Sequence, residues 1–257
     1  MGWLLGIDTA TRRGNVAIAR VNDSGTLLED VHLRSYEGAL DHAERLLREV
    51  DELLREAQVH PDEITAVAVG VGPGSFTGVR AGVMAAKGLA FSVGARLIPV
   101  GSLETMARAC QHPGPRLTLL DARRGELFAA VYGGDGAVLL APEHLPRSVL
   151  PAWLAPVPSG VLLGEVEDIL LPGFVLVRSP ETDLPGGLAL LELALTRSPV
   201  DAASLEPSYL RPPDAMLSSA GLLPTGRPRL DSASHGRDER IRARASVGAF
   251  WAQLHCR

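Results

Sequence analysis

The chain has 257 residues, of which 46% are apolar, and a formal net charge of −5. This length and this apolar fraction allow a buried core without metal ions or disulfides, and they indicate one or two domains. The negative charge argues against nucleic-acid binding through a broad basic surface. Two cysteines make no disulfide framework, the first residues lack a signal peptide, and no apolar run is long enough for a membrane span, so we expect a cytoplasmic protein.

Three strands are predicted at the start of the chain. They run over Trp3–Asp8, Asn15–Arg20 and Thr26–Leu33. The cluster Asn22–Gly25 between the second and the third is typical of a hairpin turn. We therefore expect the protein to open with an antiparallel meander.

A long amphipathic helix is predicted next, within residues 37–59. One stripe of this helix alternates steps of four and three residues, as in the contact between two packed helices: Ala43, Leu47, Val50, Leu54 and Ala57. The stripe fits either the chain's own sheet or a second protein. The sequence leaves both interpretations open.

A glycine-rich turn, GVGPGSFTG, follows the predicted strand Thr65–Val71. It resembles a phosphate-binding loop, but no lysine follows Gly78 as in a Walker loop, and the dinucleotide pattern G-x-G-x-x-G misses by one residue. The backbone N–H groups of such a turn can still bind an anion, and a purely architectural turn is the alternative. The candidate residues for a nucleotide or anion are Asp8, Thr9, Gly74, Ser75 and Thr77.

The helix predicted over Val79–Val93 is small or apolar almost all round. Its two charges, Arg80 and Lys87, are seven residues apart and share one face. A helix of this kind is expected to be buried on both sides, by the chain's own sheet on one side and by a second protein or subdomain on the other. With the preceding helix it predicts a partner interface of nine residues: Ala43, Leu47, Val50, Leu54, Arg80, Val83, Ala85, Ala86 and Lys87.

A strand over Arg96–Val100 and a helix over Ser102–Ala109 complete an α/β pattern with a mixed sheet. Leu117–Leu145 then repeats the pattern of Trp3–Leu33, with a strand, an aspartate, an Arg-Arg-Gly turn and two more strands. This repeat predicts two similar subdomains, the second one reduced. We place them at residues 1–112 and 113–213, followed by an extension, residues 214–257, that we expect to be poorly ordered.

An enzymatic interpretation rests on three residues, Asp8, Thr9 and Asp121. In an actin-like ATPase core, carboxylates after the first strand of each half bind phosphate-associated magnesium. The context of Asp121 is Asp-Ala-Arg, however, where close approach to a phosphate would require glycine. Because Asp121 does not fit this role well, we keep a stand-alone nucleotide-dependent phosphotransferase only as the alternative hypothesis.

Six motifs, in order, resemble the TsaB family, the non-catalytic subunit of the bacterial tRNA threonylcarbamoyladenosine synthase: LLGIDTAT, HAERLL, GVGPGSFTGVRAGVMAAKGLA, LIPVGSLE, DARRGELFAAVY and EPSYLR. The resemblance covers Leu4 to about Arg211. It implies an actin-like (RNase H-like) fold of two subdomains. It also implies a partner interface on the two helices described above.

The resemblance further implies a complex with the catalytic paralogue TsaD and the ATPase TsaE, a homodimer when the chain is alone, and contact with tRNA only through the complex. TsaD-like proteins carry two metal-binding histidines where this chain has Ser102 and Met106. Neither replacement is a suitable ligand for such a metal, so we expect no catalytic residue, no metal site and no tightly bound cofactor. ATP or ADP with magnesium is expected, if anywhere, at the interface with the catalytic subunit.

Overall fold

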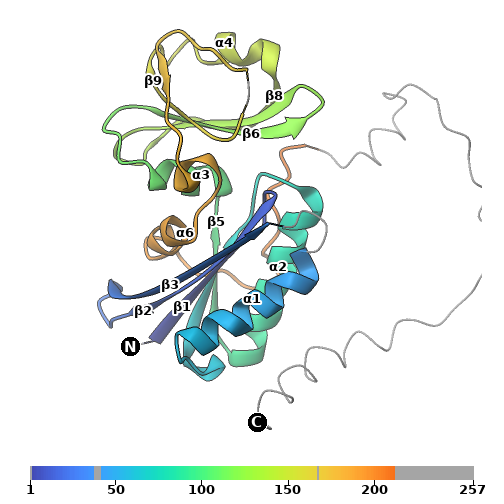
Figure 1. Ribbon diagram of the computed structural model, residues 1–257, viewed down its shortest axis with the longest axis vertical. Helices are drawn as coiled ribbons and strands as arrows, with labels where there is room; N and C mark the ends of the chain where they lie inside the picture. Colours follow the sequence, from blue (N-terminus) through green and yellow to red (C-terminus); the bar gives the residue numbers. More distant parts are fainter. Residues whose placement is uncertain (1, 38–41, 167, 212–257) are drawn as a thin grey trace, which may run out of the picture. The chain divides into compact units, whose positions relative to one another are not determined.

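Two five-stranded sheets with the same arrangement of strands form the frame of the chain (Figure 1). The computed structural model describes residues 2–37, 42–166 and 168–211. The predicted extension, residues 214–257, lies outside the described residues, and the predicted subdomain boundary at residue 112 stays a prediction. Within the described part, no helix is long and apolar enough to cross a membrane.

The first sheet has the order β3-β2-β1-β4-β5. Its strands are β1 (Gly2–Asp8), β2 (Arg13–Val21), β3 (Leu27–Glu37), β4 (Ile64–Gly70) and β5 (Arg96–Val100). The first three strands pair antiparallel, whereas β4 and β5 continue from β1 in parallel. This is the mixed sheet that the sequence predicts, and β4 is buried as expected for a central parallel strand.

The second sheet repeats this arrangement with the order β10-β9-β6-β7-β8. Its strands are β6 (Arg116–Arg123), β7 (Glu126–Tyr132), β8 (Val138–Pro146), β9 (Gly160–Leu163) and β10 (Phe174–Leu176). Here too an antiparallel meander continues into parallel strands. The internal repeat and the predicted actin-like (RNase H-like) α/β fold are confirmed.

Helices cover both faces of the first sheet. α1 (His42–Glu56) and α2 (Phe76–Val93) lie on one face, and α6 (Gly187–Ala194) lies on the other (Figure 1). α3 (Ser102–Ala109) follows β5 and packs on one face of the second sheet. Within the described residues, the other α-helices of the second half that lie next to this sheet are the short α4 (Leu150–Trp153) and α5 (Pro180–Asp183). The second half is therefore reduced in its helices, as predicted, but not in its number of strands.

Two predicted bounds differ from the structure by three residues or more. The third strand extends to Glu37, because residues up to Glu37 still pair with β2. α2 begins at Phe76, because the side chain of Ser75 accepts a hydrogen bond from the N–H of Gly78 and caps the helix.

Candidate functional site

Asp8 ends β1 and is fully buried. Its Oδ1 accepts a hydrogen bond of 2.8 Å from the N–H of Ala10, and its Oδ2 accepts one of 2.9 Å from the hydroxyl of Ser102. Burial raises the pKa of Asp8 to about 6, although the two hydrogen bonds act to lower it. Both oxygens of this carboxylate therefore have partners within the chain.

The glycine-rich turn packs directly on the two residues that follow Asp8. The hydroxyl of Thr9 donates to the carbonyl of Gly78 at 2.7 Å, and the N–H of Ser75 donates to the carbonyl of Ala10 at 2.6 Å. A β-carbon at Gly74 would lie 2.2 Å from the carbonyl oxygen of Ala10, and one at Gly78 would lie 2.1 Å from that of Thr9. These glycines let α2 approach the chain's own backbone closely.

The structure brings Asp8, Thr9, Gly74 and Ser75 together, but the side chains of Asp8 and Thr9 are buried. Asp8 and Thr9 have no exposed surface, whereas Ser75 and Thr77 are exposed. Nucleotide or anion binding at this turn stays a prediction. The architectural interpretation accounts for both glycines.

Ser102 and Met106 are both fully buried. The hydroxyl of Ser102 is engaged with Asp8, and Met106 packs in the core between α3 and the second sheet, against residues such as Leu120 and Phe128. A serine hydroxyl and a thioether in these surroundings offer no ligand set for a hard metal ion.

Asp121, the third residue of the alternative hypothesis, lies on the second sheet and is exposed. Its Oδ1 accepts a hydrogen bond of 3.0 Å from the N–H of Arg123 and lies 3.9 Å from a guanidinium nitrogen of Arg147. The phosphotransferase hypothesis needs Asp8 and Thr9 open to a ligand as well. Because both are fully buried, the geometry gives it no support.

Four of the nine predicted interface residues are buried within the chain itself: Val50, Leu54, Val83 and Ala86. They pack where α1 and α2 meet each other and the first sheet, so these four side chains have almost no surface left for a partner. The predicted interface as a whole stays a prediction. The side chain of Ala43 lies outside the described residues. Leu47, Ala85 and Lys87 are half-buried and Arg80 is exposed, so these four are open to a partner.

An exposed stripe runs along the outer face of α2. Arg80, Met84, Lys87 and Phe91 follow in steps of four, three and four, which places them on one side of a helix. Met84 is 64% exposed and Phe91 is 90% exposed. Sequence reasoning found the two cations on this face but missed the two large apolar residues between and beyond them; we call these four residues the α2 stripe.

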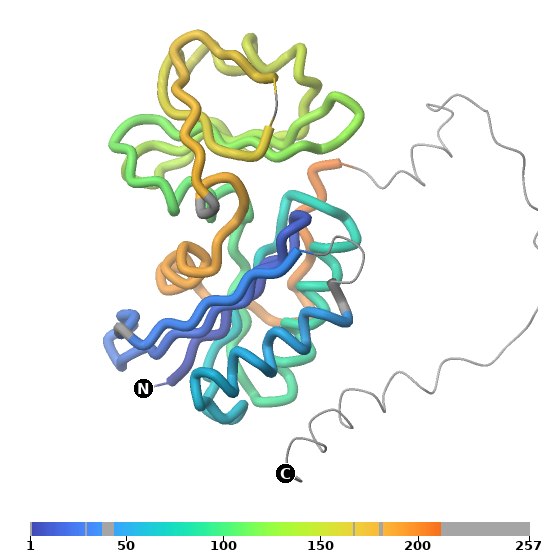
Figure 2. The backbone as a smooth tube through the Cα atoms, viewed as in Figure 1, coloured from blue at the N-terminus to red at the C-terminus, as the bar shows by residue number. Residues whose placement is uncertain are grey.

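Two aromatic residues extend the α2 stripe at the start of the helix. The rings of Phe76 and Tyr209 lie 5.1 Å apart, and the guanidinium of Arg80 lies 5.2 Å from the centre of the Phe76 ring. Tyr209 arrives there because the N–H of Ser208 donates to the carbonyl of Val71, which holds the last described segment beside the turn before α2 (Figure 2). Both rings are partly exposed.

Arg34 attaches α1 to the edge of the first sheet. From β3 its guanidinium hydrogen-bonds three carboxylates of α1, those of Glu49, Glu52 and Glu56. Glu49 is buried and also accepts from Arg45, so this end of the network is largely shielded from water. The attachment keeps α1 beside α2 and so helps to fix the surface that carries the α2 stripe.

Comparisons with known proteins agree with this architecture. A family model described as "TsaD: tRNA N6-adenosine threonylcarbamoyltransferase" matches residues 36–143. The chain is similar to the tRNA threonylcarbamoyladenosine biosynthesis protein TsaB of Bacillus subtilis, with 30% identity over 224 residues that cover 81% of this chain and 93% of the relative. The protein of the same name from Escherichia coli is 38% identical over 135 residues, covering 51% of this chain and 55% of the relative.

A solved structure, YeaZ from Pseudomonas aeruginosa, is similar with a TM-score of 0.64 and 29% identity. The match covers 82% of this chain and 100% of that one. The part of the chain that matches this structure is thus about as long as the described part of the chain, and longer than one subdomain.

Proposed function

The chain belongs to the TsaB family of tRNA threonylcarbamoyladenosine biosynthesis proteins, and we propose that within this machinery it is a non-catalytic subunit that binds and activates the catalytic subunit TsaD. Its contribution is a surface. The transfer of threonylcarbamoyl to the adenosine beside the tRNA anticodon takes place on the partner.

The α2 stripe is the observation that carries this proposal. A helix that is buried on its inner face exposes Met84 and Phe91 on its outer face. Large apolar side chains in a row, flanked by Arg80 and Lys87, are typical of the centre of a protein–protein interface, where aromatic, Met and Arg residues are enriched.

The family match indicates what surface the partner is expected to present. The TsaD model covers residues 36–143, a range that includes both α1 and α2, so a TsaD subunit is expected to present a comparable pair of helices. Two such pairs can pack helix against helix around an approximate two-fold axis. The same argument supports a homodimer when this chain is alone.

A non-catalytic role is supported by the residues around β1. The carboxylate of Asp8 is closed off by Ser102, and Met106 lies in the core, so the residues that replace the metal-binding histidines serve packing. A catalyst at this place would need a polar group open to its substrate.

The test is to place a charge on the α2 stripe without disturbing the core. Met84→Asp and Phe91→Asp change exposed side chains, so both variants should fold like the parent while their affinity for TsaD falls by roughly 30-fold or more, as for interface hot spots. Leu170→Asp is the matched control, because Leu170 is 95% exposed and lies away from α2. Pull-down by TsaD and threonylcarbamoyl transfer to tRNA are the two measurements.

Normal assembly and normal transfer with both aspartate variants would contradict the proposal. Lys87 gives a second, independent measurement because it is the only lysine of the chain. An amine-reactive reagent should therefore label one side chain, and TsaD should protect it. Equal labelling with and without TsaD would place the interface elsewhere.

The remaining partners follow from the same proposal. We expect TsaE to join only the complex, tRNA to bind only through the complex, and ATP or ADP with magnesium to bind at the subunit interface rather than to this chain alone. Titration of the isolated chain with Mg-ATP should show no stoichiometric binding. Tight binding with turnover would instead favour the phosphotransferase hypothesis.

A further inference from the structure

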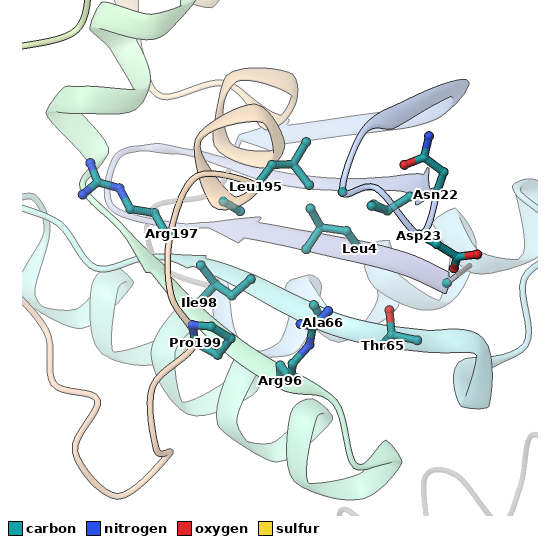
Figure 3. A pocket seen from close by; sticks show the side chains of 14 residues that line it. Leu4, Asn22, Asp23, Thr65, Ala66, Arg96, Ile98, Leu195, Arg197 and Pro199 are labelled. Carbon is teal, nitrogen blue, oxygen red and sulfur yellow. The ribbon is translucent and has the colours of Figure 1, made fainter.

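A hollow of about 420 Å³ lies on the α6 face of the first sheet, where β1, β4 and β5 begin (Figure 3). It is on the opposite face of the sheet from α1 and α2. The proposed partner surface and the turn around Asp8 therefore do not account for it.

The hollow exists because α6 is too short to cover the sheet. Its eight residues span about 12 Å, whereas the seven residues of β1 span about 23 Å. α6 packs on the strands up to Ala194, and the chain then turns through Leu195 and Pro199 toward the edge of β5, where Val200 pairs with Leu97. The start of the sheet is therefore bordered by the end of α6 but is not covered by it.

The floor of the hollow is apolar. Leu4, Ala66 and Ile98 come from three neighbouring parallel strands, and all three point to the α6 face because side chains alternate along a strand. Ala194 and Leu195 complete this apolar lining from the end of α6. A volume of this size and lining are typical of a site for a small organic molecule.

Arg96 supplies the free charge at this site. It stands two residues before Ile98 on β5, so it points to the same face, and Figure 3 shows its side chain beside Ala66, its register partner on β4. Among the described residues its guanidinium has no hydrogen-bond or ion-pair partner. By contrast, Arg197 on the same rim is paired with Glu104.

Two other polar side chains line the hollow from the β2–β3 turn. Asn22 uses its side-chain oxygen within the turn, as an acceptor from Ser24 and Thr26, and this leaves its amide N–H groups as donors. Asp23 is the only carboxylate among the lining residues, and in Figure 3 it points away from Leu4 and the floor. The free groups near the floor are therefore donors.

We propose that this hollow binds a small amphiphilic carboxylate, with its apolar body on Leu4, Ala66 and Ile98 and its carboxylate on Arg96. A guanidinium without a partner matches a carboxylate in shape and charge. The site is independent of the proposed partner surface, so a negative result for one proposal does not affect the other.

Three probes with one apolar body and different head groups test the proposal on the full chain: hexanoate, 1-hexanol and hexylamine. The chain has six isoleucines, so methyl-labelled isoleucine gives a spectrum in which Ile98 reports on the hollow and Ile7 on the opposite face. Hexanoate should shift the Ile98 signal saturably and bind roughly fivefold more tightly than 1-hexanol, the effect of one partly exposed ion pair.

Arg96→Gln should remove this fivefold preference and leave the affinity for 1-hexanol unchanged. Arg48→Gln, on the exposed face of α1, is the matched control and should behave like the parent. Leu195→Trp should fill the hollow and abolish binding of both probes, with a melting temperature that confirms the fold.

Absence of binding by hexanoate, equal affinity for hexanoate and 1-hexanol, tighter binding of hexylamine, or an unchanged affinity in Arg96→Gln would each overturn the proposal. A shift at Ile7 instead of Ile98 would overturn it as well, because the probe would then occupy another site.

Discussion

Replacing Gly78 by alanine tests whether the glycine-rich turn serves the chain's own packing. The new β-carbon would lie 2.1 Å from the carbonyl oxygen of Thr9, and the side chain of Thr9 already donates to the carbonyl of Gly78. The obstructing atom is a backbone oxygen, so relief requires β1 and α2 to separate. Overpacking costs about 1–3 kcal/mol, and we expect the upper end here because backbone must move. Alanine returns about 1 kcal/mol through its helix propensity, which leaves a net loss of about 2 kcal/mol.

Thermal unfolding of the isolated chain, followed by circular dichroism, measures this loss. For a chain of this size about 2 kcal/mol lowers the melting temperature by roughly 4–8 °C. Gly88→Ala is the matched control on the same helix, because a β-carbon there meets nothing within 4 Å. It should raise the melting temperature by roughly 2–4 °C through helix propensity alone. A Gly78→Ala protein that melts at or above the parent would refute the reasoning.

Three further predictions concern stability. Burial raises the pKa of Asp8 from 3.8 in the unfolded chain to about 6 in the native state, so ionisation of Asp8 destabilises the native state as the pH rises between these values. Asp8→Asn should therefore add about 3 kcal/mol to the free energy of unfolding at pH 8 and little at pH 4, as measured by unfolding in urea. Arg34→Ala should lower the free energy of unfolding by about 1–2 kcal/mol, because three carboxylates of α1 lose their ion-pair partner. Arg55→Ala, which removes the exposed ion pair with Asp51, should lower it by about 0.3–0.5 kcal/mol. Ala86→Glu buries an unpaired carboxylate and should not yield a folded protein, whereas Ala85→Glu, at a half-buried position, should fold and weaken TsaD binding. A folded Ala86→Glu protein would show that α2 can shift.

Local patterns predicted the elements well where each residue's environment depends on its neighbours in sequence. Arg96–Val100 and Ser102–Ala109 have the predicted bounds. The end of β3 depends on contacts that no local pattern contains: Arg34 bonds α1 and Tyr36 pairs with Gly14 of β2. The strand therefore runs beyond Leu33.

The candidate interface shows what periodicity cannot decide. Steps of four and three along α1 correctly predict a packed stripe, but Val50 and Leu54 pack within the chain, and the same spacing would serve a contact with another molecule. On α2 the periodicity fails for another reason. The helix is apolar on most sides, so its sequence does not indicate which side is buried. Only the sheet shows that Met84 and Phe91 point outward.

The two faces of α2 connect the burial of Asp8 and Thr9 to the proposed scaffold role. Gly74 and Gly78 allow the start of α2 to lie directly on the residues after β1, and this same contact leaves Asp8 and Thr9 no exposed surface. A phosphate could reach Asp8 only if α2 moved away, which would break the hydrogen bond between Thr9 and Gly78 and expose the apolar inner face of the helix. The packing that fixes α2 as a rigid platform for the α2 stripe therefore also keeps Asp8 and Thr9 buried, so the two properties should be lost together when the glycines are replaced.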